Sequence, residues 1–599
     1  MKTRKDKPLL MLSFAASLLA FSACTDDKYD LSDLDTTIAV GSDSGLKLPS
    51  SSTKQIVLDD LLELNDSKTV VIDSHGDYLF QQQGDDVTPV RPNIERIFVS
   101  EESTSNYPVL IEVKGLPDGF DLIPVGTELP GTAGSLTHEI QTFNYKGTLP
   151  DEVKSLKAAD VEGGFNVEIS FNDDLKGYIS AFKIFKVEFP LFMEFEVASA
   201  SQDCTKEGNV LTFNEVPSSK SLNIVAKINK LDFTKSNATN SLTLSDGNVS
   251  MVGDVKVNVE YGDAKKGSGN VKNLQINSTV QISTLTIVSA TGSFSPEIKI
   301  EDLGGVTLDD LPDFLTDDDV VVDLYNPQII IDIQSDLSVP GLLKGTLVAK
   351  DEMGKEMSRV NIPQVKINAI EDNAGKSCIL ICRQQPSVAE QADYTDVAVV
   401  PELSNIIRKI PHTISFETEA SADASRDDSF ILLGHDYTIK PSYRIEAPLA
   451  FGADARIVYT DRLDGWNDDI QDYEFADDSY LRVTAEIENK VPAHLVMSAQ
   501  AIDVRGNEID NLAVDVDKTI AASDDGATAK TTPLTIMVKQ KSPGALKAVD
   551  GIIFTIKAAA ADGGNSAVVN KTLNAYNQNL TAKNIVVELV GRVVIKSDD

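Results

Sequence analysis

Cysteine is scarce in this sequence, which has four in 599 residues: Cys24, Cys204, Cys378 and Cys382. Cys24 lies at the end of an N-terminal leader, and the three that remain are an odd number, so no disulfide framework is predicted. Cys378 and Cys382 would lie on one face of a strand, about 13 Å apart at roughly 3.3 Å per residue. That separation exceeds disulfide reach. The scarcity excludes a small disulfide-stapled scaffold.

Signatures of catalysis and metal binding are also missing. The five histidines lie in no zinc-binding or hydrolase motif: His75, His138, His412, His435 and His494. No G-x-S-x-G, C-x-x-C or phosphate-binding glycine loop occurs. Distant residues could still assemble a triad or a carboxylate pair, but the sequence singles out none. We therefore predict no catalytic residue, no metal site and no cofactor, and the chain is expected not to be an enzyme.

Basic residues are outnumbered, with 54 Lys and Arg against 92 Asp and Glu, which gives a net charge of -38. Such a balance makes nucleic acid or an anionic membrane face an unfavourable partner. The acidic residues are spread along the whole chain, which indicates a solubilising surface.

No apolar run reaches the roughly 20 residues that a membrane-spanning helix needs. The nearest approach is residues 9–21, which follow a basic leader containing Lys2, Arg4, Lys5 and Lys7. A basic start followed by about 13 apolar residues is typical of a secretory signal peptide. Residues 1–23 are therefore predicted to be a signal peptide.

The leader ends in Phe21-Ser22-Ala23-Cys24, which resembles the lipobox of bacterial lipoproteins, although Phe21 stands where leucine is usual. The resemblance covers only the first two dozen residues. It implies that Cys24 is acylated and becomes the mature N-terminus, tied to a membrane by its lipid. An ordinary signal peptide with a chance cysteine is the alternative.

Residues 24–54 are polar and carry Pro49 and a serine run, so they are predicted to form a lipidated flexible tether. The acidic residues just behind Cys24, Asp26 and Asp27, resemble the export signal of Bacteroidetes lipoproteins that reach the outer face of the outer membrane. This resemblance implies an outer-membrane protein exposed at the cell surface.

Strand-like alternation recurs after the tether. In KVNVEYG, Val257, Val259 and Tyr261 share one face, and LTIMVKQK places Leu534, Ile536 and Val538 on one face. Helical periodicity appears only in short pieces such as LDDLLEL and PELSNIIRKI. The predicted fold class is mostly β, with tandem antiparallel, Ig-like β-sandwich modules and few short helices.

Internal repeats suggest a duplication. Residues 58–73, LDDLLELNDSKTVVID, align without gaps on residues 308–323, LDDLPDFLTDDDVVVD. Two further pairs follow in the same order, an ISF run at 169–171 and 414–416 and a P-L strand at 186–191 and 444–449. We therefore predict two duplicated halves, in which each repeat begins the first sandwich of its half.

A finer echo lies inside the second half. Val339-Pro340 and Asp351-x-x-Gly354 match Val491-Pro492 and Asp503-x-x-Gly506, and each Asp-x-x-Gly is expected to turn a hairpin. Two sandwiches per half follow, with modules at 55–160 (A1), 161–300 (A2), 301–400 (B1) and 401–599 (B2).

The densest acidic segment surrounds the single tryptophan, Trp466, and contains Asp461, Asp464, Asp468, Asp469, Asp472, Glu474, Asp477 and Asp478. Clustered carboxylates suit calcium, and an exposed indole could serve as a ligand platform. The spacing does not fit an EF-hand loop. We favour a solvated loop whose Trp466 plugs the core of its own module.

This interpretation makes a prediction for Trp466→Ala. Removing an enclosed indole should cost roughly 3 to 5 kcal/mol of unfolding free energy. An exposed ligand platform would instead lose ligand retention with little change in stability. Acrylamide quenching separates the two, because strong quenching with a red emission maximum would reject the core assignment.

The pattern as a whole resembles multi-domain Bacteroidetes surface lipoproteins of tandem β-sandwich modules. It implies a non-enzymatic cell-envelope lipoprotein that displays its modules for binding or structural roles. The alternative is a glycan-binding accessory lipoprotein of a polysaccharide-uptake system, which the low aromatic content, 6%, disfavours. A hidden hydrolase is a third possibility. The expected partners are the membrane, through the lipid, and a protein or glycan ligand.

Overall fold

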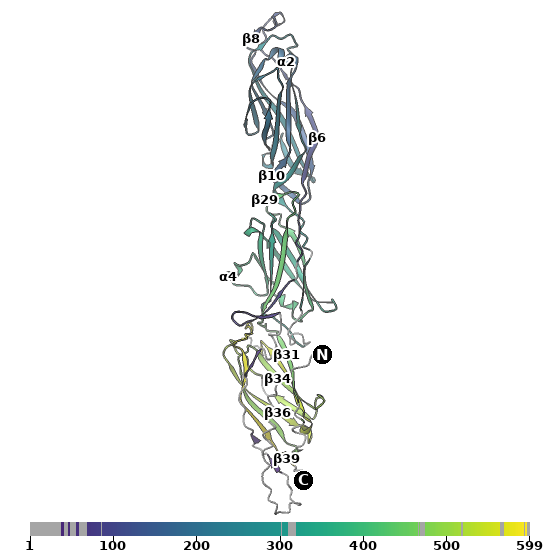
Figure 1. Ribbon diagram of the computed structural model, residues 1–599, viewed down its shortest axis with the longest axis vertical. Helices are drawn as coiled ribbons and strands as arrows, with labels where there is room; N and C mark the ends of the chain where they lie inside the picture. The colour runs from purple at the N-terminus through teal and green to yellow at the C-terminus, as the bar shows by residue number, and fades with distance from the viewer. Residues whose placement is uncertain are drawn as a thin grey trace, which may run out of the picture.

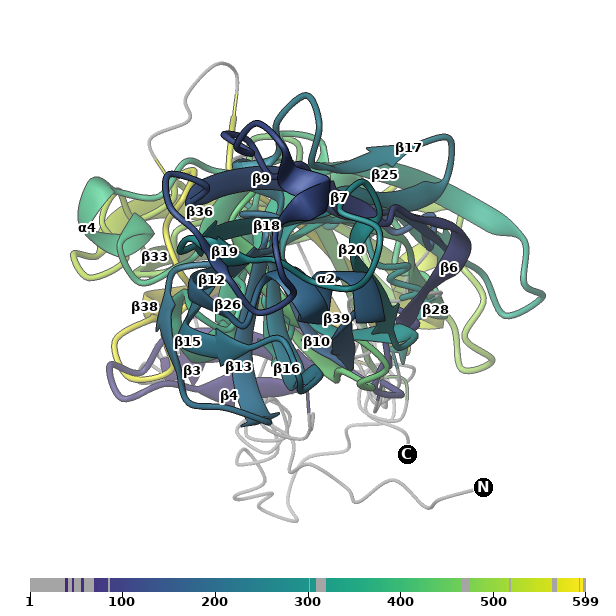
Figure 2. The same cartoon turned by 90° about the horizontal axis from the view of Figure 1, so that it is seen from above.

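The chain forms an elongated rod, with β8 near one end and β39 near the other (Figure 1). The computed structural model describes residues 38–40, 46–47, 55–58, 69–84, 87–300, 302–308, 319–464, 467, 474–516, 519–562, 568–591 and 593–595. These residues form three modules stacked end to end, which we call basal, middle and distal. Seen down the long axis, the modules overlap one another closely (Figure 2).

The first described strands ascend the rod, and we call residues 38–111 the strap. Its strands are β1 (Ile38–Val40), β2 (Leu46–Lys47), β3 (Gln55–Val57), β4 (Val70–Ile72), β5 (Tyr78–Gln83), β6 (Ile97–Asn106) and β7 (Val109–Ile111). β2 and β3 pair with β38 of the basal module, β5 with β30 of the middle module, and β6 and β7 with β21 and β20 of the distal module. The strap thus contributes strands to all three modules.

The middle module shows the strand pairing most simply. Its strands are β22 (Asp302–Thr307), β23 (Gln328–Ser335), β24 (Gly341–Lys350), β25 (Glu356–Ile367), β26 (Lys376–Cys382), β27 (Asp396–Val399), β28 (Thr413–Ala422), β29 (Ser429–Leu432) and β30 (Ile439–Pro448). One sheet has the order β22-β28-β24-β25, and the other has the order β27-β26-β23-β30-β5-β4. β27 runs parallel to β26, whereas β23 pairs antiparallel with both β26 and β30.

The basal module repeats this pairing. Its strands are β31 (Arg456–Leu463), β32 (Glu474–Phe475), β33 (Tyr480–Asn489), β34 (His494–Ile502), β35 (Leu512–Val516), β36 (Lys530–Gln540), β37 (Gly551–Ala559), β38 (Asn579–Val590) and β39 (Val593–Ile595). The order β31-β37-β34 corresponds to β22-β28-β24, and the order β36-β33-β38 corresponds to β26-β23-β30. β38 then receives strap strands as β30 does. The two modules therefore share the arrangement of these six strands, whereas β25 pairs with β24 and β35 pairs with β36 in the opposite sheet.

The distal module elaborates the same scheme. Its strands are β8 (Glu128–Leu129), β9 (Gly134–Thr148), β10 (Val153–Glu162), β11 (Gly164–Phe171), β12 (Ala181–Glu188), β13 (Met193–Ala200), β14 (Cys204–Glu207), β15 (Val210–Pro217), β16 (Leu222–Asp232), β17 (Ser241–Ser245), β18 (Asn248–Tyr261), β19 (Ala264–Lys265), β20 (Leu274–Ile282) and β21 (Leu285–Phe294). The order β9-β18-β12-β15 matches β22-β28-β24-β25. The order β16-β11-β20-β7 matches β26-β23-β30-β5.

Helical elements among the described residues are short. They are η2 (Phe120–Leu122), α2 (Asp173–Tyr178), η3 (Phe233–Lys235), η4 (Asn373–Gly375), α4 (Val388–Gln391), η5 (Leu403–Ile406) and η6 (Ala545–Ala548). The predicted helical piece PELSNIIRKI corresponds to η5, whereas most of LDDLLEL lies outside the described residues. Within the described ranges, no helix has the length and apolarity that crossing a membrane requires.

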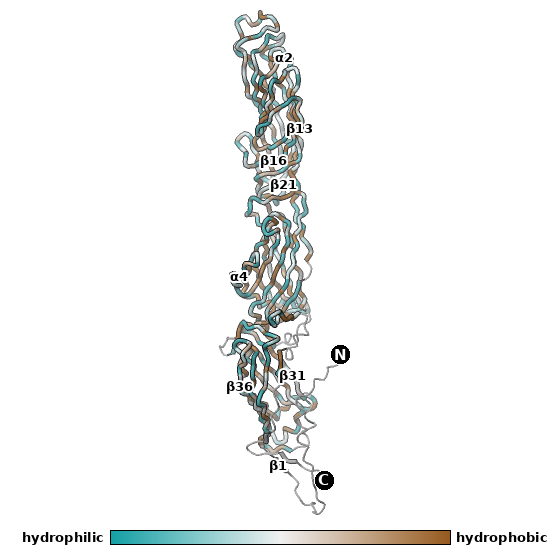
Figure 3. Tube along the Cα trace, turned by 60° about the vertical axis from the view of Figure 1, so that its left-hand side comes forward, coloured by the Kyte–Doolittle hydropathy of each residue, from teal (hydrophilic) through white to brown (hydrophobic). Residues whose placement is uncertain are grey.

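Alternation along the strands builds the cores, and hydrophobic and hydrophilic residues interleave along the whole rod (Figure 3). The predicted strand face Val257, Val259 and Tyr261 is buried on β18. Leu534 and Val538 are buried on β36, with Ile536 half-buried between them. The mostly-β fold of sandwich modules predicted from these patterns is confirmed.

The distal and middle modules share one continuous hydrophobic core, which extends from Ile94 to Ile445. β29 leaves the middle module and pairs with β21 of the distal module, so Ile431 is buried opposite Ala290. A salt bridge of 2.9 Å between Lys157 and Asp427 also crosses this junction. Shared strands and a shared core fix these two modules to each other.

The strand pairing corrects the predicted module boundaries. β10 lies across the A1/A2 boundary at 160/161, yet it pairs with β16 and β21, so both predicted modules belong to one sheet system. β28 and β30 lie beyond the B1/B2 boundary at 400/401, yet they pair with β24 and β23. The chain therefore divides into the strap and modules ending near Phe294, Pro448 and Ile595.

The predicted duplication of halves is wrong, because the matched ISF runs lie on strands that do not correspond: residues 169–171 are on β11, the counterpart of β23, and residues 414–416 are on β28, the counterpart of β18. Leu58 and Val70 of the first copy and Val320 and Val322 of the second pack in a single hydrophobic cluster between the middle and basal modules. The strands that follow the two copies, β5 and β23, pair with opposite sides of β30. Val70–Ile72 is a strand, whereas Val321 makes only an isolated bridge to Arg456.

The shorter repeat, at residues 339–354 and 491–506, lies at corresponding positions of the middle and basal modules. Asp351 follows β24 and Asp503 follows β34, which are corresponding strands of the middle and basal modules. Each carboxylate accepts backbone N–H groups two and four residues on, at 3.0 and 2.9 Å for Asp351 and at 2.8 and 2.9 Å for Asp503. Gly354 and Gly506 have φ of 78° and 79°, which only glycine adopts readily. Both predicted hairpin turns are confirmed.

A third copy of this turn lies in the strap and begins at Asp73. The repeat alignment matches Asp73 with Asp323 and so does not reveal this turn. Asp73 accepts the N–H groups of His75 and Asp77 at 2.8 and 2.9 Å, and Gly76 has a φ of 88°. The backbone hydrogen bond from Asp77 is the main cause that holds the pKa of Asp73 below its usual value. This turn connects β4 to β5 and positions β5 against the middle module.

Candidate functional site

The outer face of the middle module has a polar groove. On β23, Ile329, Ile331 and Ile333 point into the core, so Ile330, Asp332 and Gln334 point outward. The register places these three beside outward residues of β26 and β30. The three alternate positions therefore form three cross-strand rows on this face.

Half of this face is apolar and covered. Ile330, Leu380 and Cys382 form a small cluster that residues of the segment 383–400 overlie, with Tyr394 and Val397 packed against it. The segment carries α4 and projects from the side of the rod (Figure 1). Small satellite clusters are commonly buried under long loops. Here the loop leaves the neighbouring cross-strand rows of outward residues uncovered.

The thiols in this cluster are not nucleophiles. Burial raises the pKa of Cys382 to about 11, and burial together with a hydrogen bond to Asp332 raises that of Cys378 to about 11. Both thiols are protonated at neutral pH, and a protonated thiol reacts poorly. Cys204, Cys378 and Cys382 are all free cysteines, and the absence of a disulfide between Cys378 and Cys382 agrees with their spacing on one strand.

The uncovered rows form the floor of a groove of about 800 Å³. One row consists of Lys376, Gln334 and Lys440, and the next consists of Cys378, Asp332 and Ser442. Asn368 and Asn373 line the groove as well, and residues 392–395 form a wall that contains Asp393 and Tyr394.

Hydrogen bonds hold the walls in place. Asn368 Nδ2 donates to the Lys376 carbonyl at 2.8 Å, and its backbone N–H donates to Ser377 Oγ at 2.8 Å. The Thr395 N–H donates to the Cys378 carbonyl at 2.7 Å, and the Cys378 N–H donates to Thr395 Oγ1 at 3.1 Å. The groove is therefore preformed and does not depend on a ligand for its shape.

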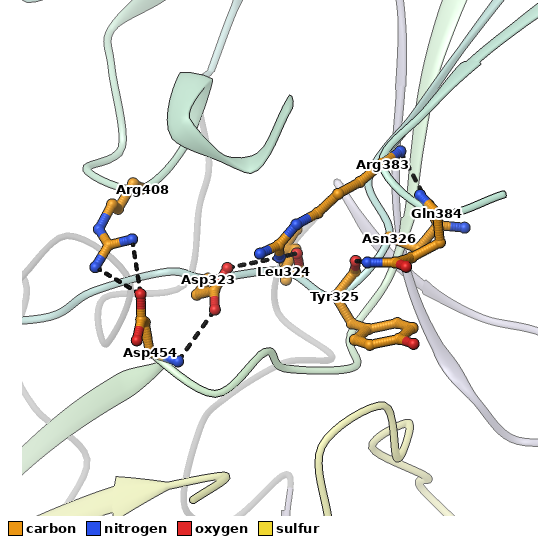
Figure 4. Close-up of polar contacts among 8 residues, drawn as sticks. All are labelled: Asp323, Leu324, Tyr325, Asn326, Arg383, Gln384, Arg408 and Asp454. Carbon is orange, nitrogen blue, oxygen red and sulfur yellow. Dashed lines mark hydrogen bonds and ion pairs between the residues drawn. The ribbon is translucent and has the colours of Figure 1, made fainter. Parts of the chain in front are cut away.

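The start of the segment 383–400 is anchored to the joint between the middle and basal modules (Figure 4). Arg383 Nη1 donates to Asp323 Oδ1 and to the Leu324 carbonyl, both at 2.7 Å. The backbone N–H groups of Arg383 and Gln384 donate to Asn326 Oδ1 at 3.1 and 2.9 Å. The same residues thus fix both the joint and one end of the segment.

Asp323 is the centre of this joint. Its side chain is only 4% exposed, and its Oδ2 accepts the Asp454 N–H at 3.1 Å. A Cβ at Gly452 would lie 2.2 Å from Oδ2, so only glycine allows this approach. Arg408 adds a surface ion pair to Asp454 at 3.2 Å. The carboxylate therefore serves as a structural acceptor between two modules.

The sequence-predicted site residues are mostly outside this region. Cys24 and Trp466 lie outside the described residues. Asn467, next to Trp466, is half-buried, and its Nδ2 donates to the Lys547 carbonyl at 2.9 Å. The core position predicted for Trp466 and the calcium alternative for its acidic neighbours both stay untested.

The five histidines lie on separate elements. His75 is exposed in the strap turn, His138 lies on β9, and His494 is buried on β34. His412 directly precedes β28, and the ring of His435 packs edge-on against Tyr437. Among the residues that the structure describes, no group of three or more His, Cys, Asp and Glu side chains could hold a metal ion.

Comparison with known proteins gives no family. No family model and no curated protein matches the chain. A protein from Parabacteroides distasonis that is assigned as secreted is similar over 50% of this chain and 90% of its own, with 16% identity and a TM-score of 0.33. The VP2 subviral particle of infectious bursal disease virus is similar over 90% of this chain and 86% of its own, with 9% identity and a TM-score of 0.13. With TM-scores this low, neither similarity assigns a function.

Proposed function

We propose that this chain is a non-enzymatic lipoprotein of the bacterial cell envelope, which holds a three-module β rod outward from the outer membrane. The observation that carries the proposal is the location of the chain ends. β1, which follows Cys24 by a short stretch of sequence, pairs with the last strand β39 at the basal end of the rod. A lipid on Cys24 would therefore attach the rod at its base and leave the distal module farthest from the membrane.

The rigid joints support this display role. A shared core and β29 connect the distal and middle modules. The strap and the Asp323 joint connect the middle and basal modules. Rods of independently tumbling modules would need no such contacts. Glycan capture is the second candidate function, and the preformed polar groove of the middle module favours it.

Cys24→Ala tests the anchoring. Because cysteine alone supplies the thiol that carries the lipid, the variant should lose acylation and leave the membrane fraction. Each buried CH₂ contributes about 0.8 kcal/mol, so several chains together give stable anchoring.

Cys204→Ala is the matched control, since Cys204 lies on β14 of the distal module. It should remain acylated and membrane-bound. If Cys24→Ala stayed in the membrane fraction after a carbonate wash, the lipoprotein proposal would be refuted. Protease shaving of intact cells would then show whether the anchored rod faces outward.

A further inference from the structure

We propose that the groove of the middle module binds an acidic polysaccharide, with Lys376 and Lys440 as the residues that recognise its anionic groups. This inference rests on the proposed display role, because a rod at the cell surface meets such polymers. It deepens that role by naming a site and a ligand class.

The groove floor carries two positive charges. Lys376 and Lys440 flank Gln334 in one cross-strand row, so their Cα atoms lie about 10 Å apart at the usual strand spacing. Neither ammonium group makes a salt bridge within the described part of the chain. Two cations of one row are therefore available to an anionic ligand, although the chain as a whole has a net charge of -38.

The nearest carboxylate on the groove floor, that of Asp332, does not neutralise the charges of Lys376 and Lys440. Asp332 Oδ2 accepts a 2.6 Å hydrogen bond from Arg444 Nη1, so its charge is already paired. At physiological ionic strength the screening length is about 8 Å, so acidic residues elsewhere on the rod act weakly here. The local potential of the groove is set by the two lysines and by Asp393 on the wall.

The other lining groups suit a sugar. Gln334 and Asn368 line the groove with side-chain amides whose Nε2 and Nδ2 atoms donate to the Ala374 and Lys376 carbonyls at 2.9 and 2.8 Å, which leaves their amide oxygens as the acceptors for ligand hydroxyls. Tyr394 is half-buried on the wall, and burial raises its pKa, so it stays a neutral phenol. A neutral aromatic edge beside amides and cations fits a polymer of hydroxyl-rich rings that carry acidic groups.

The size and openness of the groove favour a segment of a chain over a small metabolite. About 800 Å³ lies near the upper end of ordinary ligand sites. The floor is the flat outer face of three strands, so a polymer can enter and leave along it. The preformed walls reduce the entropy cost of binding.

Titration calorimetry of the full mature chain with three hexasaccharides tests the proposal. The probes are hexagalacturonate, a sulfated chondroitin hexasaccharide and neutral maltohexaose, and the first two distinguish carboxylated from sulfated ligands. We expect one or both acidic probes to bind, with an affinity that falls as salt rises. Maltohexaose should bind at least about tenfold more weakly.

Lys376→Gln with Lys440→Gln should lower the affinity for the acidic probe about tenfold, the effect of losing two solvent-exposed charge pairs. Lys114→Gln with Lys355→Gln removes the same charge from exposed positions elsewhere and should leave the affinity unchanged. Asp393→Asn removes the remaining wall carboxylate and should raise the affinity. A merely structural role for these residues predicts no such pair of opposite changes.

Three results would overturn the proposal. They are absence of binding by both acidic probes, equal binding of maltohexaose that the lysine variants do not alter, and equal binding of a single-stranded oligonucleotide, which would show attraction to any polyanion. None of these bears on Cys24, so the anchoring proposal would stand or fall separately.

Discussion

Tyr78→Ala is expected to loosen the joint between the middle and basal modules, at a cost of about 3 to 5 kcal/mol. Tyr78 is 1% exposed and belongs to the cluster that residues of the strap, the middle module and the basal module share. Its backbone N–H donates to the Leu573 carbonyl and its carbonyl accepts the Leu449 N–H, both at 2.9 Å. Removing the ring leaves a cavity at the point where three segments of the chain meet.

Hydrogen exchange at the Leu449 and Leu573 amides measures this effect, together with urea unfolding. Tyr107→Ala is the matched control, since Tyr107 is a strap tyrosine of 41% exposure in the distal module. It should change stability by less than about 1 kcal/mol. Unchanged protection of Leu449 and Leu573 in Tyr78→Ala would show that the strap does not hold the two modules together.

Asp323→Ala is expected to destabilise the same joint from its other side, also by about 3 to 5 kcal/mol. Removing one partner of a buried ion pair leaves the other charge uncompensated. Arg383, with a side chain 22% exposed, would keep only the Leu324 carbonyl as its acceptor. The Asp454 N–H would lose its acceptor as well.

The repeat counterpart Asp73 supplies the control. Its side chain is 37% exposed and caps a turn whose hydrogen bonds to Asn574 and Ala575 of the basal module are made by His75, Gly76 and Asp77 and not by the Asp73 carboxylate. Asp73→Ala should therefore cost about 1 kcal/mol, the usual value for a lost backbone cap. Equal effects of the two alanine variants would mean that the Asp323 pair stabilises nothing beyond its local turn. Amide exchange at Gly452 and Arg456 reports on the joint directly.

Local features of the fold could be predicted from the sequence because they depend on neighbouring residues. Alternation at Val257 and Val259 determines which face of β18 is buried whatever its partner is. The Asp351 and Asp503 turns follow from side-chain acceptors and glycine φ values within five residues. Strand partners do not follow in this way, since antiparallel pairing can join residues hundreds of positions apart, as it joins Gln55 to Thr581.

The repeat at residues 58–73 and 308–323 shows how this limit misled the interpretation. Similar sequences indicated similar positions in two halves, yet Leu58 packs between the middle and basal modules and its aligned counterpart Leu308 packs in the core of the distal and middle modules. Val70, Val320 and Val322 all lie buried in the cluster between the middle and basal modules. Asp73 and Asp323 then diverge, one exposed in a turn and one buried against Arg383.

The groove could not be predicted from the sequence either, because its residues come from segments that are far apart in the chain, chiefly β23, β26, β30 and the segment 383–400. A signal was present in the strands: Asp332 and Gln334 alternate with isoleucines, as Lys440 and Ser442 alternate with core residues. That pattern shows that the outer face is polar. Only the register shows that Lys376 and Lys440 flank Gln334.

The pairing of the strap with strands near the end of the sequence affects how the chain folds during its synthesis. Gln55 pairs with Thr581 and Ile38 with Ile595, so the first strands made meet the last ones. Loop-closure entropy grows only slowly with length, but contacts of such high order form late. The distal module is the first whose strands are all translated, and the basal module is the last. The early strands therefore have open edges until the basal module has been translated, which is a period of exposure to aggregation.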